Sequence, residues 1–202
     1  MNKGFTVWFT GLSGAGKSTL SQILGKKLKE FGRNAEILDK DLVSANLCQD
    51  LGLTKDDRDI CIQRIAFVCK LLTRNGVAVL SPAISPYREA RETARNEIEH
   101  FVEVYVKCPR EVCVERAVKG LSGRALKDNV KEFAGISDPY EEPLNPDVVV
   151  ETDKETIEES ANKIVQKLIE LGYISQTGSA GHVYSPEEED KIKERLSRLG
   201  YL

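Results

Sequence analysis

The stretch GLSGAGKS, from Gly11 to Ser18, constrains the fold of this chain more than any other feature. It satisfies the spacing GxxxxGK[ST], with an apolar run before it and a helix-like segment after it. In that context the glycines let backbone N–H groups close around phosphates, and the start of the helix adds partial positive charge. The spacing therefore predicts a site for a nucleoside triphosphate.

Two side chains of this loop have predicted roles in phosphoryl transfer. Lys17 is expected to reach the β and γ phosphates, and Ser18 to offer its hydroxyl to Mg²⁺. A GTPase would be expected to carry an NKxD signature, which the sequence lacks, so we predict a kinase that uses ATP. The predicted ATP-binding residues in the loop are Gly11, Ser13, Gly14, Ala15, Gly16, Lys17, Ser18 and Thr19.

The rest of the chain alternates short apolar runs with helix-like segments. The runs are rich in β-branched residues, as expected for parallel strands covered on both faces. The pattern predicts an α/β chain of the P-loop NTPase fold, with a parallel sheet of about five strands flanked by helices. Strands are expected at Phe5–Thr10, Ala35–Leu38, Val77–Leu80, Val102–Val106 and Val148–Val150, and helices at Lys17–Phe31, Arg58–Thr73, Tyr87–Glu99, Arg110–Arg116 and Lys154–Leu171.

Two segments interrupt this alternation and set the predicted domain organisation. Residues 1–174 are expected to form one kinase domain, in which the charged, Gly- and Pro-rich stretch at about 117–146 is too long for an ordinary connection. We interpret it as a lid that keeps water from the phosphoryl group. Residues 175–202 are expected to form a linker and a C-terminal amphipathic helix, which docks either on its own domain or on another protein.

Charge and composition argue against several classes of protein. The formal net charge of −3 gives no basic excess for binding nucleic acid, and no apolar run approaches the roughly 20 residues that cross a bilayer. The five cysteines form no CxxC pair, which argues against both a disulfide framework and a zinc site. We expect them to be buried thiols of a cytoplasmic protein.

The acceptor of the phosphoryl group is expected near Leu38-Asp39-Lys40-Asp41, which follows the second predicted strand. Ligands in such sheets bind at the carboxyl ends of the strands. Two carboxylates there can hold Mg²⁺ through water and take the proton of an incoming hydroxyl. An alternative role for Asp41 is to cap a helix, and the two roles do not exclude each other.

Several further motifs follow one another in a fixed order along the chain. They are GLSGAGKST at Gly11–Thr19, Leu38–Asp41, Asp56-Asp57-Arg58, AISPY at Ala83–Tyr87, Glu103–Val106, Cys108-Pro109, Val112-Cys113, Lys119-Gly120-Leu121, GISDPYE at Gly135–Glu141, and Asn145-Pro146. Together they resemble the adenylyl-sulfate kinase family, over about Gly4 to Tyr173. The resemblance implies that MgATP phosphorylates the 3′-hydroxyl of adenosine 5′-phosphosulfate, a small-molecule acceptor. It also implies a homodimer or association with a sulfurylase.

The resemblance also implies roles for individual residues, Lys17 being the catalytic cation. Asp41 matches the Mg²⁺-linked aspartate and catalytic base, and Asp39 lies beside it at the acceptor. Ser85, in Ile84-Ser85-Pro86, matches a serine described as a phosphoserine intermediate, but direct transfer needs no covalent step and we expect it to line the acceptor pocket. The other matches are Arg58 on the phosphosulfate, Phe133 stacked on the acceptor's adenine, Lys119 in the lid and Arg116 stacked on the adenine of ATP.

The acceptor side departs from the family pattern at Lys40, Ser44, Leu53, Cys61 and Gln63, where the family usually has glycine, arginine, phenylalanine, asparagine and arginine. These departures keep two alternatives open beside an adenylyl-sulfate kinase. One is a kinase of the same family with another small nucleotide or metabolite as acceptor. The other is a nucleotide-binding domain of low turnover with a regulatory or assembly role.

Overall fold

The chain folds around one parallel sheet, described by a computed structural model that covers residues 3–52, 54–120 and 139–175. All pairs of neighbouring strands are parallel, in the order β2-β3-β1-β4-β5. Strands β2 and β3 therefore lie on one side of the central strand β1, and β4 and β5 lie on the other. The strand order changes direction at β1, and such a change opens a crevice at the carboxyl ends of the strands. The strands are β1 (Phe5–Thr10), β2 (Ala35–Ile37), β3 (Ala78–Pro82), β4 (Phe101–Lys107) and β5 (Val148–Glu151).

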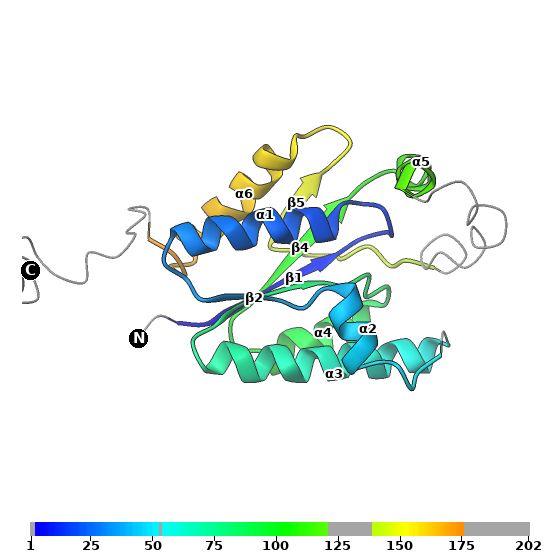
Figure 1. The fold of residues 1–202 in the computed structure, drawn as a ribbon, viewed down its shortest axis with the longest axis horizontal. Coiled ribbons are helices and arrows are strands. Elements are labelled where there is room, and N and C mark those ends of the chain that lie inside the picture. The colour runs from blue at the N-terminus through cyan, green and yellow to red at the C-terminus, as the bar shows by residue number, and fades with distance from the viewer. Residues whose placement is uncertain (1–2, 53, 121–138, 176–202) are drawn as a thin grey trace, which may run out of the picture.

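Helices cover both faces of the sheet (Figure 1). Helices α1 and α6 lie on one face, and α3 and α4 lie on the other. The phosphate loop runs from β1 directly into α1, so the start of that helix faces the crevice. The helices are α1 (Lys17–Glu30), α2 (Lys40–Asn46), α3 (Lys55–Arg74), α4 (Arg88–Glu97), α5 (Arg110–Gly120) and α6 (Ile157–Glu170).

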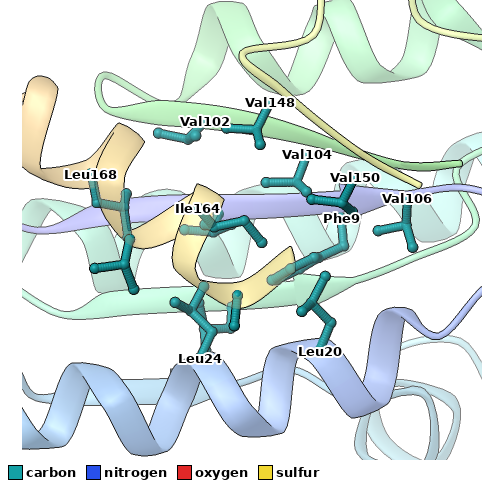
Figure 2. Close-up of a cluster of buried hydrophobic side chains, with 14 of the residues drawn as sticks. Phe9, Leu20, Leu24, Val102, Val104, Val106, Val148, Val150, Ile164 and Leu168 are labelled. Carbon is teal, nitrogen blue, oxygen red and sulfur yellow. The ribbon is translucent and has the colours of Figure 1, made fainter. Parts of the chain in front are cut away.

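The face covered by α1 and α6 has an aliphatic core (Figure 2). Leu20 and Leu24 of α1 and Ile164 and Leu168 of α6 pack against valines of β4 and β5, and all four are at most 1% exposed. Burial of one such side chain contributes about 1.5–3 kcal/mol. This core fixes α1 against the sheet and so fixes the helix start that follows the phosphate loop.

The opposite face contains the other half of the core and a buried ionic cluster. Trp8 of β1 packs against Phe101, at 5.7 Å between ring centroids. Nearby, Arg91 of α4 donates from Nε to Oε1 of Glu103 in β4 at 2.9 Å, and both side chains are less than 10% exposed. Such a buried pair is costly to break, because it would leave one charge uncompensated.

The predicted fold is confirmed: the parallel sheet has its five strands, and helices flank it. The sequence pattern missed α2, whose seven residues are too few to show a helical period. It also placed the start of the last described helix three residues early, because a capping box between Thr156 and Glu159 begins α6 at Ile157. The predicted C-terminal helix lies outside the described residues, and so does most of the predicted lid.

Two expectations were wrong. The helix cap at the end of β2 is Asp39 and not Asp41, since Oδ1 of Asp39 accepts from the backbone N–H of Leu42 at 2.8 Å. The cysteines are not all free thiols, because Cys48 and Cys61 form a disulfide with 5.6 Å between their Cα atoms. Sequence spacing did not reveal that the chain turns back between α2 and α3.

Candidate active site

The phosphate loop is held open by its glycines. Gly14 has φ +84°, and a Cβ there would lie 2.6 Å from the carbonyl oxygen of Cys113. Gly16 caps α1 with φ +99°. Both conformations are left-handed and favour glycine, so the loop needs these residues to keep its shape beside α5. Ser18 and Thr19, in the first turn of α1, are exposed.

Lys17 is buried beneath this loop and held by it. Its Nζ donates to the carbonyl oxygens of Gly11 and Leu12, each at 2.8 Å. Burial lowers the pKa of Lys17 to about 8, against a smaller opposing effect of Cys113. A phosphate group would favour the charged ammonium, which gives Lys17 a strong differential interaction with an anionic ligand.

The far side of the loop is tied to β5 and α5. Thr152 donates from Oγ1 to the carbonyl oxygen of Ala15 at 2.9 Å. Arg116 in turn donates to Oγ1 and to the carbonyl oxygen of Thr152, at 3.0 and 2.7 Å. These bonds place Arg116 beside the phosphate loop. The stacking role remains a prediction.

One cavity of about 1240 Å³ joins the predicted donor and acceptor residues. Its donor end is lined by the phosphate loop, the first turn of α1 and Arg116. Its acceptor end is lined by the segment after α2, by α3 and by the loop after β3. Of the residues predicted from sequence, it brings together Ser13, Gly14, Gly16, Lys17, Ser18, Thr19, Arg58, Ile84, Ser85 and Arg116.

The remaining predicted residues are placed less directly. Asp39 follows the wall residue Leu38 but does not itself belong to the described wall of the cavity. Asp41 lies in the first turn of α2, and Lys119 near the end of α5. Phe133 lies outside the described residues. Gly11 and Ala15 are buried in the phosphate loop.

Ser85 is the most constrained residue of the acceptor end. It is 2% exposed, and it has φ +39°, the one left-handed non-glycine residue in the described part of the chain. Its Oγ accepts from Nε1 of Trp8 at 3.0 Å and donates to Oγ1 of Thr10 at 3.1 Å. Strained residues of this kind are found at functional sites, where the surroundings hold them.

The Ser85 loop is anchored further by a buried arginine. Arg91 donates from Nη1 to the carbonyl oxygen of Ser85 at 2.6 Å and from Nη2 to that of Glu141 at 2.7 Å. Tyr140 and Thr10 share a hydroxyl–hydroxyl hydrogen bond of 2.9 Å. The last part of the predicted lid, at Tyr140 and Glu141, is therefore fixed to the loop that lines the acceptor end.

Sequence reasoning missed the residues that support the site, namely Trp8, Thr10, Arg91, Tyr140 and Thr152. Trp8 and Ser85 lie 77 positions apart, and Thr152 and Ala15 lie 137 apart, so no local pattern relates them. Tyr140 was noted only as part of the GISDPYE motif. A buried tryptophan, whose N–H normally finds a partner, was the one available signal.

Comparison with known proteins identifies the family. Residues 3–151 match the sequence profile of the adenylylsulphate kinase family. The adenylyl-sulfate kinase of Rippkaea orientalis is 55% identical over 174 residues, which cover 86% of this chain and 96% of that protein. The chain belongs to the adenylyl-sulfate kinase family.

Solved structures of the family agree in fold. The APS kinase of Mycobacterium tuberculosis, solved in complex with AMPPNP and APS, superposes with a TM-score of 0.75 at 39% identity and covers 83% of this chain and 99% of that one. The hexameric APS kinase from Thiobacillus denitrificans superposes with a TM-score of 0.67 at 34% identity. That match covers 86% of this chain and 30% of the longer relative.

Proposed function

We propose that this chain transfers the γ-phosphoryl group of ATP to the 3′-hydroxyl of adenosine 5′-phosphosulfate, giving 3′-phosphoadenylyl sulfate and ADP. The observation that carries the proposal is the shared cavity, in which Lys17 of the phosphate loop and Arg58 of α3 line the same space. A donor and an acceptor bound there meet without intervening protein. Positioning of this kind supplies much of the catalysis in phosphoryl transfer.

Each end of the cavity has a defined part in the reaction. Lys17 neutralises charge on the transferred group, and the backbone N–H groups of the loop hold the remaining phosphates. Arg58 binds the anionic phosphosulfate of the acceptor, and Arg116 contacts the adenine of ATP. Asp41 takes the proton of the 3′-hydroxyl as the new P–O bond forms.

The described residues fit a magnesium ion at the donor end. Ser18 is exposed, lines the cavity and follows Lys17 at the start of α1, where its hydroxyl is a suitable oxygen ligand. We propose that Ser18 and Asp41 hold Mg²⁺, Asp41 through water. When bound, the ion neutralises phosphate charge and orients the leaving group.

Ser85 serves this reaction as part of the acceptor wall. Its Oγ contacts Trp8 and Thr10, neither of which is a base able to remove the hydroxyl proton. We therefore propose direct transfer between ATP and the acceptor, with Ser85 fixing the shape of the pocket beside Ile84.

The test is ADP release from MgATP with and without adenylyl sulfate, beside AMP, adenosine, shikimate and gluconate as acceptors. We expect release to depend on adenylyl sulfate, and the product to carry its new phosphate on the 3′-oxygen by ³¹P and ¹H NMR. A faster reaction with another acceptor would support the alternative of a same-family kinase. Binding of ATP without release of ADP on any acceptor would support the low-turnover regulatory domain.

We also propose that the chain works in the cytoplasm, where ATP is supplied, as a homodimer or beside a sulfurylase. The hexameric relative supports self-association within the family. No helix among the described residues is long and apolar enough to cross a membrane. Light scattering of the purified chain tests the assembly, and a monomeric mass at working concentration would contradict a homodimer.

A further inference from the structure

A disulfide crosses the acceptor end of the cavity. Cys48 lies just after α2 and Cys61 lies in the second turn of α3, and both residues line the cavity. The bond therefore links two walls of the acceptor end. The donor end is built from other elements, the phosphate loop, α1 and α5.

The linked walls carry the residues expected to bind the acceptor. Arg58 precedes Cys61 by three positions on α3, so the two side chains share one face of the helix. Leu51 and Gly52, a few residues after Cys48, also line the cavity. A change at the disulfide is thus transmitted to the acceptor contacts and not to the phosphate loop.

Among the described residues, the disulfide is the covalent link between these walls. Arg64 of α3 also contacts the segment, through the carbonyl oxygen of Leu47 at 2.8 Å and the carboxylate of Asp50 at 2.6 and 2.8 Å. The side chains of Arg64 and Asp50 are 40% and 63% exposed, and exposed ion pairs contribute little to stability. Reduction would therefore leave the segment held to α3 by noncovalent contacts alone, which are this exposed ion pair, the hydrogen bond to Leu47 and apolar packing of Val43 and Leu47.

The other three cysteines differ in their surroundings. Cys69, Cys108 and Cys113 are free and buried, whereas Cys48 and Cys61 are half-buried at the cavity wall. Burial raises the pKa of Cys69 and of Cys113 to about 12, which disfavours the reactive thiolate. Reagents for thiols and disulfides should therefore reach the Cys48–Cys61 pair first.

We propose that Cys48 and Cys61 form a reversible oxidation site that sets the affinity of the acceptor end, which rests on the function proposed above. Disulfides in cytosolic proteins are mostly transient, catalytic or redox-sensing. The oxidised form holds the acceptor wall in its binding shape, and the reduced form must order that wall when the acceptor binds. Oxidation state then changes KM for the acceptor and leaves ATP binding as it is.

A low-molecular-weight disulfide such as glutathione disulfide can oxidise the two cysteine thiols by thiol–disulfide exchange. One protein thiolate attacks a sulfur of glutathione disulfide, forming a mixed disulfide and releasing one glutathione thiolate. The second protein thiolate then attacks the protein sulfur of that bond and releases the second glutathione. The two protons of the protein thiols end on the two glutathione molecules, and a dithiol such as dithiothreitol reverses the reaction.

The test compares the full chain after treatment with glutathione disulfide and after treatment with dithiothreitol. Alkylation of the denatured chain should modify three cysteines in the oxidised protein and five in the reduced one, as read by mass spectrometry. We expect reduction to raise KM for adenylyl sulfate about fivefold and to leave KM for ATP within about twofold, since preorganisation is lost at one end only.

Variants separate this effect from the other thiols. Cys48→Ser and Cys61→Ser should each show the high KM in both treatments, and the matched control Cys69→Ala should respond as the wild type does. An equal KM in the oxidised and reduced wild type, or a response that persists in Cys61→Ser, would overturn the proposal. Should a serine variant fail to fold, the wild-type comparison still decides.

A second readout does not depend on the acceptor. Hydrogen–deuterium exchange of the backbone in residues 47–61 should rise on reduction, while exchange in the phosphate loop stays unchanged. If neither form turns over adenylyl sulfate and this exchange still rises on reduction, the proposed function fails, but the claim that the Cys48–Cys61 disulfide orders the acceptor wall stands. If turnover is normal and neither the exchange nor KM for adenylyl sulfate changes on reduction, the claim about the disulfide fails and the proposed function stands.

Discussion

The two ends of the cavity are built in different ways. The phosphate-binding part of the donor end is one continuous segment, in which glycines and backbone N–H groups form the site and Lys17 supplies the charge. The acceptor end draws on the segment after α2, on α3 and on the loop after β3, with side chains and a disulfide as its wall. A site whose ligand contacts come from backbone groups depends on the spacing of the whole loop. A site whose contacts come from side chains can be altered by substitution of one residue at a time.

The departures predicted from the sequence lie away from the phosphate loop. The phosphate loop keeps every residue of its motif, and the departures at Ser44, Cys61 and Gln63 all lie in α2 or α3. The residue Cys61 has a structural role in this wall, because its sulfur bonds to that of Cys48.

The largest expected effect is at the donor end. Lys17→Ala should lower kcat/KM by at least about 10³-fold, because it removes a buried charge that acts on the transferred group. The matched control is Lys26→Ala, an exposed lysine on the same helix, which should leave the rate unchanged. Circular dichroism checks that both variants fold, and more than a tenth of wild-type turnover in Lys17→Ala would remove Lys17 from its role.

The two aspartates that follow β2 should differ in role, Asp41 acting in catalysis and Asp39 stabilising the fold. Asp41→Asn is expected to lower kcat about 10²-fold, as for loss of a general base. Asp39→Ala is expected to lower the free energy of unfolding by about 1 kcal/mol through loss of the α2 cap, measured by urea denaturation. A change in KM alone for Asp41→Asn would make that residue a binding group.

At the acceptor end, Arg58→Ala should raise KM for adenylyl sulfate about 10- to 100-fold, since a charge-assisted hydrogen bond contributes about 1.5–3 kcal/mol. The dissociation constant for ATP should stay unchanged by isothermal titration calorimetry. Arg64→Ala, on the same helix but bonded to Asp50, is the matched control and should change KM less than threefold. Equal losses in the two variants would contradict a direct contact by Arg58.

The smallest effect is expected at Ser85. Ser85→Ala keeps the buried loop but loses the hydrogen bonds to Trp8 and Thr10, so kcat should fall less than about tenfold. Mass spectrometry of enzyme mixed with ATP alone should find no phosphate on Ser85. A Ser85 phosphate that passes to the acceptor at the rate of turnover would establish a covalent step instead.

Sequence alone predicted the strands and the position of the phosphate loop between β1 and α1, because these signals are local. The spacing of Gly11, Gly16 and Lys17 defines a loop whose shape follows from backbone conformation, and the apolar runs defined the five strands. The hydrogen bonds that hold Ser85 were not predictable, since they join the loop after β3 to Trp8 of β1 and to Arg91 of α4. The short polar helix α2 and the disulfide beside it were missed for the same reason, because tertiary contacts determine them.

The account's central claim is that the donor end serves ATP while the acceptor end selects adenylyl sulfate. The most direct test is the ratio of kcat/KM for adenylyl sulfate to kcat/KM for AMP, which lacks the sulfate. We expect a ratio of at least about 100 in the wild type and a fall of at least about tenfold in Arg58→Ala, in line with loss of one charged contact. A wild-type ratio near one, or a ratio that Arg58→Ala leaves unchanged, would contradict the claim.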